Sequence, residues 1–396
     1  MPQSLALRLA LTTALSLIAA LPAGRARACG GCFAPSGQAS PVVAHRMAVL
    51  LAEDRMVLWD QFEYDGDPSE FVWVLPVMGS EEVELELSED DFFQQLSSMT
   101  QVQLSGPFLG GGGSGRAGFA CGGSAASSSG VPDRSVVTVY REETVGPYET
   151  AVIGSDDPDA LVSWLLERGY QVGDEMLPII AYYVRHESNF LALRIAPDAH
   201  QKRIQPVRVT CPVGSDTLPL RMVTAGVRSS VALELFVFGD RRYEAANFVN
   251  VEVDRAEITY STETATYNYD QLASAALAQR AGEVWLTEFA RALETWEPNP
   301  AVSDGEGGTY EAASDWAVVT QTYPRPYLTR MRAVLPVGAL EGDLALQASL
   351  GGDLSETVAV TRTAEDPVAA APSTLPPVSA LIVLGAGLLG LLRRRV

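Results

Sequence analysis

Short segments in which apolar and polar residues alternate recur along this chain of 396 residues, and they constrain its fold more than any other feature. Alternation with a period of two is typical of antiparallel strands that bury one face. We expect strands over residues 46–51, 55–62, 70–76, 83–87, 135–140, 148–153, 190–195, 207–210, 231–238, 284–289 and 316–322. The pattern predicts a β-rich α+β fold, built mostly from antiparallel sheet with a few helices.

Helix signals are fewer than strand signals. Acidic residues and Pro158 open a segment that stops at Gly169, and acids favour the positive end of a helix, so a helix is expected over 156–168. A second helix is expected over 270–281 and a third near 90–98.

The N-terminus has the pattern of a secretory signal peptide over residues 1–28. Arg8 precedes an apolar run over 9–21, and a small-residue cleavage site follows at Ala26 and Ala28. The run is too short to span a bilayer core of about 30 Å, which argues against a retained anchor helix. Cleavage after Ala28 makes Cys29 the first mature residue, so lipid attachment to its thiol is an alternative.

The C-terminus carries a second targeting signal. A proline-rich stretch leads into the uncharged segment 378–392, and Arg393, Arg394 and Arg395 follow it. Arginines after an apolar segment obey the positive-inside rule, so we expect the tail in the cytoplasm and the body outside. The segment is short for a permanent span at about 1.5 Å per residue. It therefore fits either a transmembrane anchor or a cleavable sorting helix.

Between these ends we expect one exported, folded body over 29–358. A Gly/Ser-rich insert at 105–130 and a loop at 298–314 interrupt it. Alanine, proline and threonine replace aromatic residues over 359–377, which indicates a linker to the C-terminal segment 378–396.

The charge balance excludes one class of partner. The chain has 28 Lys+Arg and 49 Asp+Glu, a net charge of −21. Six arginines lie in the signal peptide and the tail, which contain no acids, so the remainder has 22 basic residues and a net charge of −27. Such a body repels phosphate backbones, and we expect no nucleic-acid partner. Expected partners are the membrane, through the C-terminal helix, the export and sorting machinery, and an unidentified protein or glycan.

Four cysteines, Cys29, Cys32, Cys121 and Cys211, form an even set in a chain with an export signal, which indicates disulfide bonds. We favour two bridges that join Cys29 and Cys32 to Cys121 and Cys211. The alternatives are a Cys29–Cys32 bridge with a Cys121–Cys211 bridge, or zinc bound by four thiolates, although only one pair has ligand spacing. A redox role of the Cys-Gly-Gly-Cys motif is disfavoured because loop-forming residues follow it, whereas reactive pairs usually open a helix.

No catalytic motif is complete in the sequence. A calcium-loop pattern that begins at Asp65 lacks the glycine and the glutamate that such a loop needs. The motifs therefore predict no metal site and no cofactor. A hydrolase site without a known motif would be sought first at His186 and Glu187. The densest basic clusters are 240–242 and the group Arg325, Arg330 and Arg332. We expect them to be solvated partners of nearby acids, and anion binding is the alternative.

Several motifs spread over the body carry a family resemblance. Besides Cys29 they are Asp67–Phe71 leading to Val74–Val77, Tyr148–Glu149 leading to Ala151–Ile153, the pattern Leu-x-x-Trp-Leu-x-x-x-Gly-Tyr over 161–170, Leu218–Arg221, Leu233–Phe238 and Tyr327–Arg330. Together they cover about residues 29–336, and they resemble the bacterial family known as domain of unknown function 2330. The resemblance implies an exported or envelope protein, often membrane-anchored, and it assigns no activity and no catalytic residue.

These features favour an exported protein of the cell envelope, in the periplasm or on the cell surface, that is anchored by one span or released after cleavage. The leading hypothesis for its function is a non-catalytic binding, adhesion or scaffolding domain. One alternative is an extracytoplasmic hydrolase, and another is thiol or redox chemistry at Cys29 and Cys32.

Overall fold

The computed structural model describes residues 32–33, 42–64, 72–106, 137–168, 172–196, 205–224, 227, 229–294 and 312–364. Outside these residues lie the expected signal peptide, Cys29, Cys121 and the expected C-terminal helix. Most of the Gly/Ser-rich insert, most of the loop at 298–314 and most of the linker also lie outside them. Among the described residues, no helix is both long and apolar enough to cross a membrane. The structure is rich in strands and mostly antiparallel, which confirms the predicted fold class.

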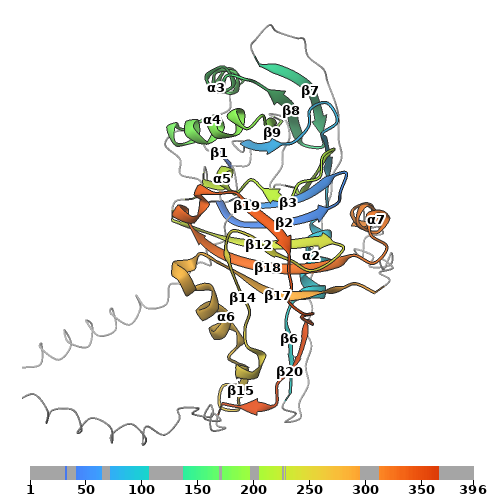
Figure 1. Ribbon diagram of the computed structural model, residues 1–396, viewed down its shortest axis with the longest axis vertical. Helices are drawn as coiled ribbons and strands as arrows, with labels where there is room; N and C mark the ends of the chain where they lie inside the picture. Colours follow the sequence, from blue (N-terminus) through green and yellow to red (C-terminus); the bar gives the residue numbers. More distant parts are fainter. Residues whose placement is uncertain are drawn as a thin grey trace, which may run out of the picture.

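The largest element is an eight-stranded sheet with the order β14-β17-β18-β12-β2-β3-β10-β5 (Figure 1). Its strands are β2 (Val42–Leu51), β3 (Met56–Tyr64), β5 (Glu84–Leu87), β10 (Val207–Cys211), β12 (Ser230–Gly239), β14 (Val249–Val251), β17 (Val284–Ala292) and β18 (Tyr327–Pro336). Neighbouring strands are antiparallel except for the β12–β2 and β14–β17 pairs. Successive residues Leu235 to Phe238 of β12 are all buried, so this part of the sheet is covered on both faces.

A five-stranded sheet packs against one face of the large sheet. Its order is β1-β4-β9-β8-β7, with β1 at Cys32–Phe33, β4 at Val72–Val77, β7 at Thr138–Val145, β8 at Tyr148–Gly154 and β9 at Asn189–Ile195. Trp73, Leu75 and Leu191 of this sheet share one core with Met47 and Val49 of the large sheet. Helices α3 (Pro158–Glu167) and α4 (Leu177–Arg185) cover its other face.

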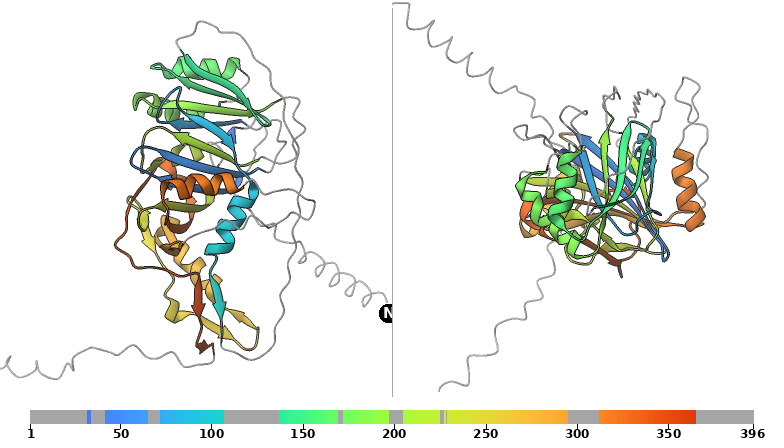
Figure 2. Two further views of the ribbon diagram at one scale, coloured as in Figure 1. Left: turned by 90° about the vertical axis from the view of Figure 1, so that its right-hand side faces the viewer. Right: turned by 90° about the horizontal axis from the view of Figure 1, so that it is seen from above.

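Helices α2 (Asp90–Thr100) and α7 (Ala312–Thr322) cover the opposite face of the large sheet over an aromatic core. Seen from above in Figure 2, α7 lies on the other side of the strands from α3 and α4. The core contains Trp59, Phe92, Phe93, Phe236, Phe238, Phe289 and Trp316. The molecule is therefore layered, with helices outside two sheets that pack on each other.

The strand predicted over 316–322 is wrong, because these residues belong to α7. The β-branched residues of this segment favour strands by local propensity. The buried residues Ala312, Asp315, Trp316 and Val319, however, have the spacing of one helix face. Thr320 and Thr322 also donate hydroxyl hydrogen bonds to carbonyl groups four residues earlier, which accommodates them in the helix.

Shorter elements complete the fold. A three-stranded sheet of β11 (Thr217–Leu218), β19 (Leu344–Ala348) and β13 (Tyr243–Ala245), together with α5 (Leu220–Val223), adds side chains to the shared core. The lower end in Figure 1 contains α6 (Tyr269–Leu277), the pair β6 (Gln103–Ser105) and β20 (Thr357–Ala359), and the sheet of β15 (Thr259–Ser261), β16 (Thr266–Tyr267) and β21 (Arg362–Thr363). The short strand β21 thus lies within the segment expected to be linker.

Candidate functional site

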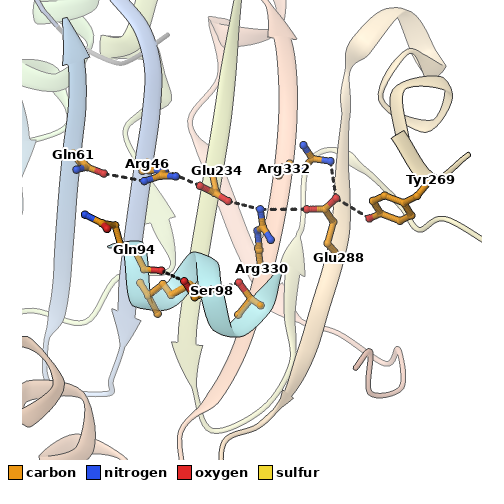
Figure 3. A network of polar contacts seen from close by, with 11 residues as sticks. Arg46, Gln61, Gln94, Ser98, Glu234, Tyr269, Glu288, Arg330 and Arg332 are labelled. Carbon is orange, nitrogen blue, oxygen red and sulfur yellow. Dashed lines mark hydrogen bonds and ion pairs between the residues drawn. The ribbon is translucent and has the colours of Figure 1, made fainter. Parts of the chain in front are cut away.

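A row of charged side chains crosses the large sheet on the face that bears α2 and α7 (Figure 3). We call it the charged row, and its members are Arg46 of β2, Glu234 of β12, Arg330 and Arg332 of β18, and Glu288 of β17. Because side chains on a strand alternate between faces, Glu234 shares its face with Phe236 and Phe238 of the aromatic core. The charged row therefore continues the aromatic core along the same sheet face.

On this face, the exposure of the side chains increases with distance from the aromatic core. On β12, Phe238 and Phe236 are buried, Glu234 is half-buried and Ala232 is exposed. The same-face residues of β18 follow the same order: Leu328 and Arg330 are buried, Arg332 is half-buried and Val334 is exposed. The charged row thus marks the boundary between the core beneath the helices and a sheet surface that faces solvent.

Glu234 joins the two halves of the charged row. Its Oε2 atom lies 3.0 Å from Nε of Arg46, and its Oε1 atom lies 2.6 Å from Nη2 of Arg330. Arg46 also donates to Oε1 of Gln61 on β3 at 3.4 Å. One carboxylate therefore orients two guanidinium groups from neighbouring strands.

Glu288 forms the other anchor, and a β-bulge places it. The pairing of β17 with β18 shifts between Thr287 and Phe289, which leaves Glu288 as the extra residue. Its Oε1 atom accepts from Arg332 Nη2 at 2.6 Å and from the Tyr269 hydroxyl at 2.8 Å, while its Oε2 atom lies 3.6 Å from Arg330 Nη2. The bulge thus brings a buried carboxylate to both arginines of β18.

The protonation states support charged arginines in the row. Burial lowers the pKa of Arg332, but Glu288 together with Tyr269 and Glu234 outweighs this effect, and the pKa is raised overall. Burial and the same carboxylate raise the pKa of Tyr269, so its hydroxyl stays protonated and donates to Glu288.

The most exposed members of the charged row are two cations, Arg46 and Arg332. Their side chains are 37% and 35% exposed, whereas those of Glu234, Arg330 and Glu288 are 14%, 10% and 3% exposed. The two carboxylates and Arg330 therefore lie deeper than Arg46 and Arg332, whose side chains reach solvent. Such an arrangement suits recognition of carboxylate groups, because a pre-oriented arginine fork loses little freedom on binding.

The expected basic clusters do pair with acids, but the most important members are not solvated. Arg330 and Arg242 are buried, and Arg242 bonds to Glu252 and to the Gly352 carbonyl oxygen. The prediction of solvated partners is therefore wrong for these two residues. Arg241, which pairs with Asp240, is exposed as expected.

Sequence reasoning did not single out Arg46, Glu234 or Glu288. Arg46 and Glu234 interrupt otherwise apolar strands, and this was the one available signal. The bulge that turns Glu288 toward Arg330 has no sequence signature that we identified, so the row could not be assembled from the sequence.

The structure describes two of the four cysteines, Cys32 and Cys211. Cys32 lies on β1 opposite Trp73, and Cys211 ends β10 with a buried sulfur that has no disulfide partner within the part of the chain that the structure describes. Burial raises the pKa of the Cys211 thiol to about 11. Because Cys29 and Cys121 lie outside the described residues, the disulfide bonds stay a prediction. Ala28 and the residues Arg393, Arg394 and Arg395 also lie outside them, so cleavage after Ala28 and the membrane tail stay predictions too.

The structure places the histidines in unlike surroundings. His186 is exposed at the end of α4, and Glu187 follows it with a positive φ of 57°. His45 is buried, and its Nε2 atom contacts Oδ1 of Asp60, whose pKa burial raises despite the opposing effect of His45. This pair lines a cavity of about 20 Å³ beside Trp73 and Leu220, which has room only for water. The sequence search did not identify this pair.

Comparison with known proteins identifies the family. No curated protein and no solved structure matches the chain. A family model described as "Uncharacterized protein conserved in bacteria (DUF2330)" matches residues 23–365. This range includes every described residue and the whole charged row, and it confirms the resemblance inferred from the sequence motifs. The chain therefore belongs to the DUF2330 family of bacterial proteins.

Proposed function

We propose that this protein is an exported, envelope-associated binding domain, and that the charged row recognises an acidic segment of a partner protein. The observation that carries the proposal is the order of exposure within the row: the side chains of Arg46 and Arg332 reach solvent, whereas Glu234, Arg330 and Glu288 are more deeply buried. A partner with acidic side chains complements this surface.

The surroundings of the row support a protein partner. Exposed Ala232 and Val334 lie next to Glu234 and Arg332 on the same face, so a partner would meet apolar contacts beside charged ones. Arginine beside apolar groups is typical of protein interfaces. The rest of the body is strongly acidic, so the row is a local cationic strip that would orient an acidic partner and disfavour docking elsewhere.

Export rests on the sequence signals. The signal-peptide pattern at 1–28 and the arginine-flanked segment at 378–396 favour a body outside the cytoplasm, either anchored or released after cleavage. N-terminal sequencing or mass spectrometry of the protein from cells tests export. A mature chain that begins at Cys29 supports the proposal, and a chain that retains residues 1–28 contradicts it.

Binding is tested by fluorescence anisotropy with a labelled glutamate-rich peptide at low salt. We expect Arg46→Gln with Arg332→Gln to weaken binding by about tenfold, because each exposed charge pair contributes up to about 1 kcal/mol. The matched control, Arg241→Gln with Arg291→Gln, removes the same charge from exposed sites outside the row.

Two outcomes contradict the binding proposal. Equal weakening by both double variants would show that only net charge matters. Preferential binding of a polyuronate over the peptide would replace the protein partner with a glycan.

A specific observation favours one alternative, an extracytoplasmic hydrolase. His45 and Asp60 form a buried pair next to a cavity, and a histidine held by a carboxylate is typical of general-base sites. The test is hydrolysis of p-nitrophenyl acetate by the mature protein and by the variants His45→Asn and His186→Asn. Turnover that only His45→Asn abolishes supports this alternative, and unchanged turnover in both variants rejects both histidines.

A further inference from the structure

Arg221 of α5 lies apart from the charged row, and its guanidinium has no hydrogen-bond partner among the described residues. Its Nε atom is buried without a partner, and the nearest carboxylate oxygen, Oδ2 of Asp343, is 4.0 Å away. The side chain is only 30% exposed. Because the donors of this guanidinium make no hydrogen bond within the described residues, a bound oxyanion would supply hydrogen bonds that the ion pair with Asp343 does not.

Aromatic stacking holds the Arg221 guanidinium in place. Its Cζ atom lies 4.0 Å from the centre of the Tyr182 ring. The His186 ring lies 4.1 Å from the same centre at 32° to the ring plane, so the two groups must occupy opposite faces of Tyr182. His186 is itself oriented by its Nδ1 atom, which lies 2.8 Å from the Tyr182 carbonyl oxygen.

The neighbouring carboxylate is already occupied. Oδ1 of Asp343 accepts from the Tyr183 hydroxyl at 2.5 Å and from the Arg221 backbone N–H at 3.1 Å. These bonds fix Asp343 beside Arg221 without a hydrogen bond to its guanidinium. Arg194 provides a contrast, because at 36% exposure it makes two bonds to Glu149, at 2.8 and 2.6 Å.

We propose that Arg221 forms an oxyanion-binding site for a carboxylate or phosphate group. Its guanidinium is oriented by Tyr182, forms a 4.0 Å ion pair but no hydrogen bond with Asp343, and offers the two-pronged donor geometry that such groups match. The site is independent of the charged row, because it lies on α4 and α5 and not on the large sheet.

The test is a titration of the mature protein with inorganic phosphate and, separately, with acetate. The NMR signal of the Arg221 Nε–Hε group reports binding. A saturable shift with phosphate alone assigns a phosphate group to the site, and one with acetate assigns a carboxylate. No saturable shift with either anion up to about 50 mM would overturn the proposal, since such weak binding carries little specificity.

Variants then connect the binding to Arg221. We expect Arg221→Gln to weaken binding by about tenfold and Arg221→Lys, which keeps the charge but loses the fork, to weaken it less. The exposed Arg241, which pairs with the adjacent Asp240, is the control, and Arg241→Gln should leave binding unchanged. Equal affinity of Arg221→Gln and the native protein would overturn the proposal. The titration of the native protein stays decisive if Arg221→Gln does not fold.

Discussion

At the scale of single residues, the charged row depends on two carboxylates that serve several donors each. Glu288 is the more deeply buried and accepts from Arg332 and Tyr269 while it lies near Arg330. Removal of one partner from a buried ionic group leaves the others uncompensated, which costs more than the ion pair itself contributes. The row is therefore a structural element as well as a candidate binding surface.

We expect Glu288→Gln to lower the free energy of unfolding by about 3 kcal/mol, because Arg332 loses its buried counter-charge and Arg330 keeps only Glu234. Urea denaturation measures the change. Glu283→Gln, at an exposed position just before the same strand, is the control and should change stability by less than about 0.5 kcal/mol. Equal stability of the two variants would show that Glu288 does not neutralise the arginines.

Cys211 gives a second prediction at this scale. Its side chain is 1% exposed, and burial raises its pKa to about 11. Both effects suppress the reactive thiolate, so a free Cys211 should resist alkylation in the native protein and react after denaturation. Peptide mapping after iodoacetamide treatment at pH 8 measures this difference. Rapid labelling of Cys211 in the native state would contradict its buried position.

At the scale of elements, α7 is fixed to the large sheet through Asp315. This fully buried carboxylate accepts from Trp59 Nε1 at 2.8 Å, from the Ser88 hydroxyl at 2.8 Å and from Arg208 Nη1 at 2.5 Å. Three segments that are distant in the sequence thus meet at one side chain. The helix depends on these contacts, because its β-branched residues do not favour helix by themselves.

We expect Asp315→Asn to lower the free energy of unfolding by about 3 kcal/mol, since Arg208 would lose its buried counter-charge. Asp159→Asn is the matched control, because Asp159 also lies in the first turn of a helix but is exposed. Thermal or urea denaturation compares the two. A loss at Asp315 no larger than that at Asp159 would contradict the anchoring role.

The same element shows how far the sequence predicts this fold. Most strands of the two large sheets and helices α2, α3 and α6 follow from alternation, capping residues and stop signals, which are local. The strands β1, β14 and β18 were not predicted, although β18 is a central strand and carries Arg330 and Arg332. Helix α7 does not, because its buried face and the Asp315 contacts are tertiary. The charged row combines both cases: Arg46 and Glu234 are visible as polar residues in apolar strands, whereas the bulge at Glu288 depends on the register of β17 with β18.

At the scale of the whole molecule, buried phenols and a buried thiol link stability to alkaline pH. Burial raises the pKa values of Tyr148, Tyr183 and Tyr269 above the ordinary value of 10.0, and that of Cys211 above 9.0. Above these values the unfolded chain releases protons that the folded protein retains. Folding is then opposed, so stability must fall as the pH rises.

We therefore expect the urea concentration at the midpoint of unfolding to decrease steadily from pH 9 to pH 11. Ultraviolet absorbance measures the ionisation of tyrosine. The buried phenols should ionise only when the protein unfolds. A midpoint that is constant or increases over this range would contradict the assigned burial of these groups.

The central claim is that an acidic partner docks on the exposed sheet face beside the charged row. Val334 and Val249 lie on strands of the same sheet at 40% and 41% exposure, and Val334 shares the face of Arg332 whereas Val249 lies on the edge strand β14. The most direct measurement is photo-crosslinking of a glutamate-rich peptide to the mature protein with a photoreactive residue in place of either valine. We predict strong crosslinking from position 334 that excess Arg46→Gln/Arg332→Gln protein does not compete away, and little from position 249. Equal crosslinking from both positions would contradict the claim.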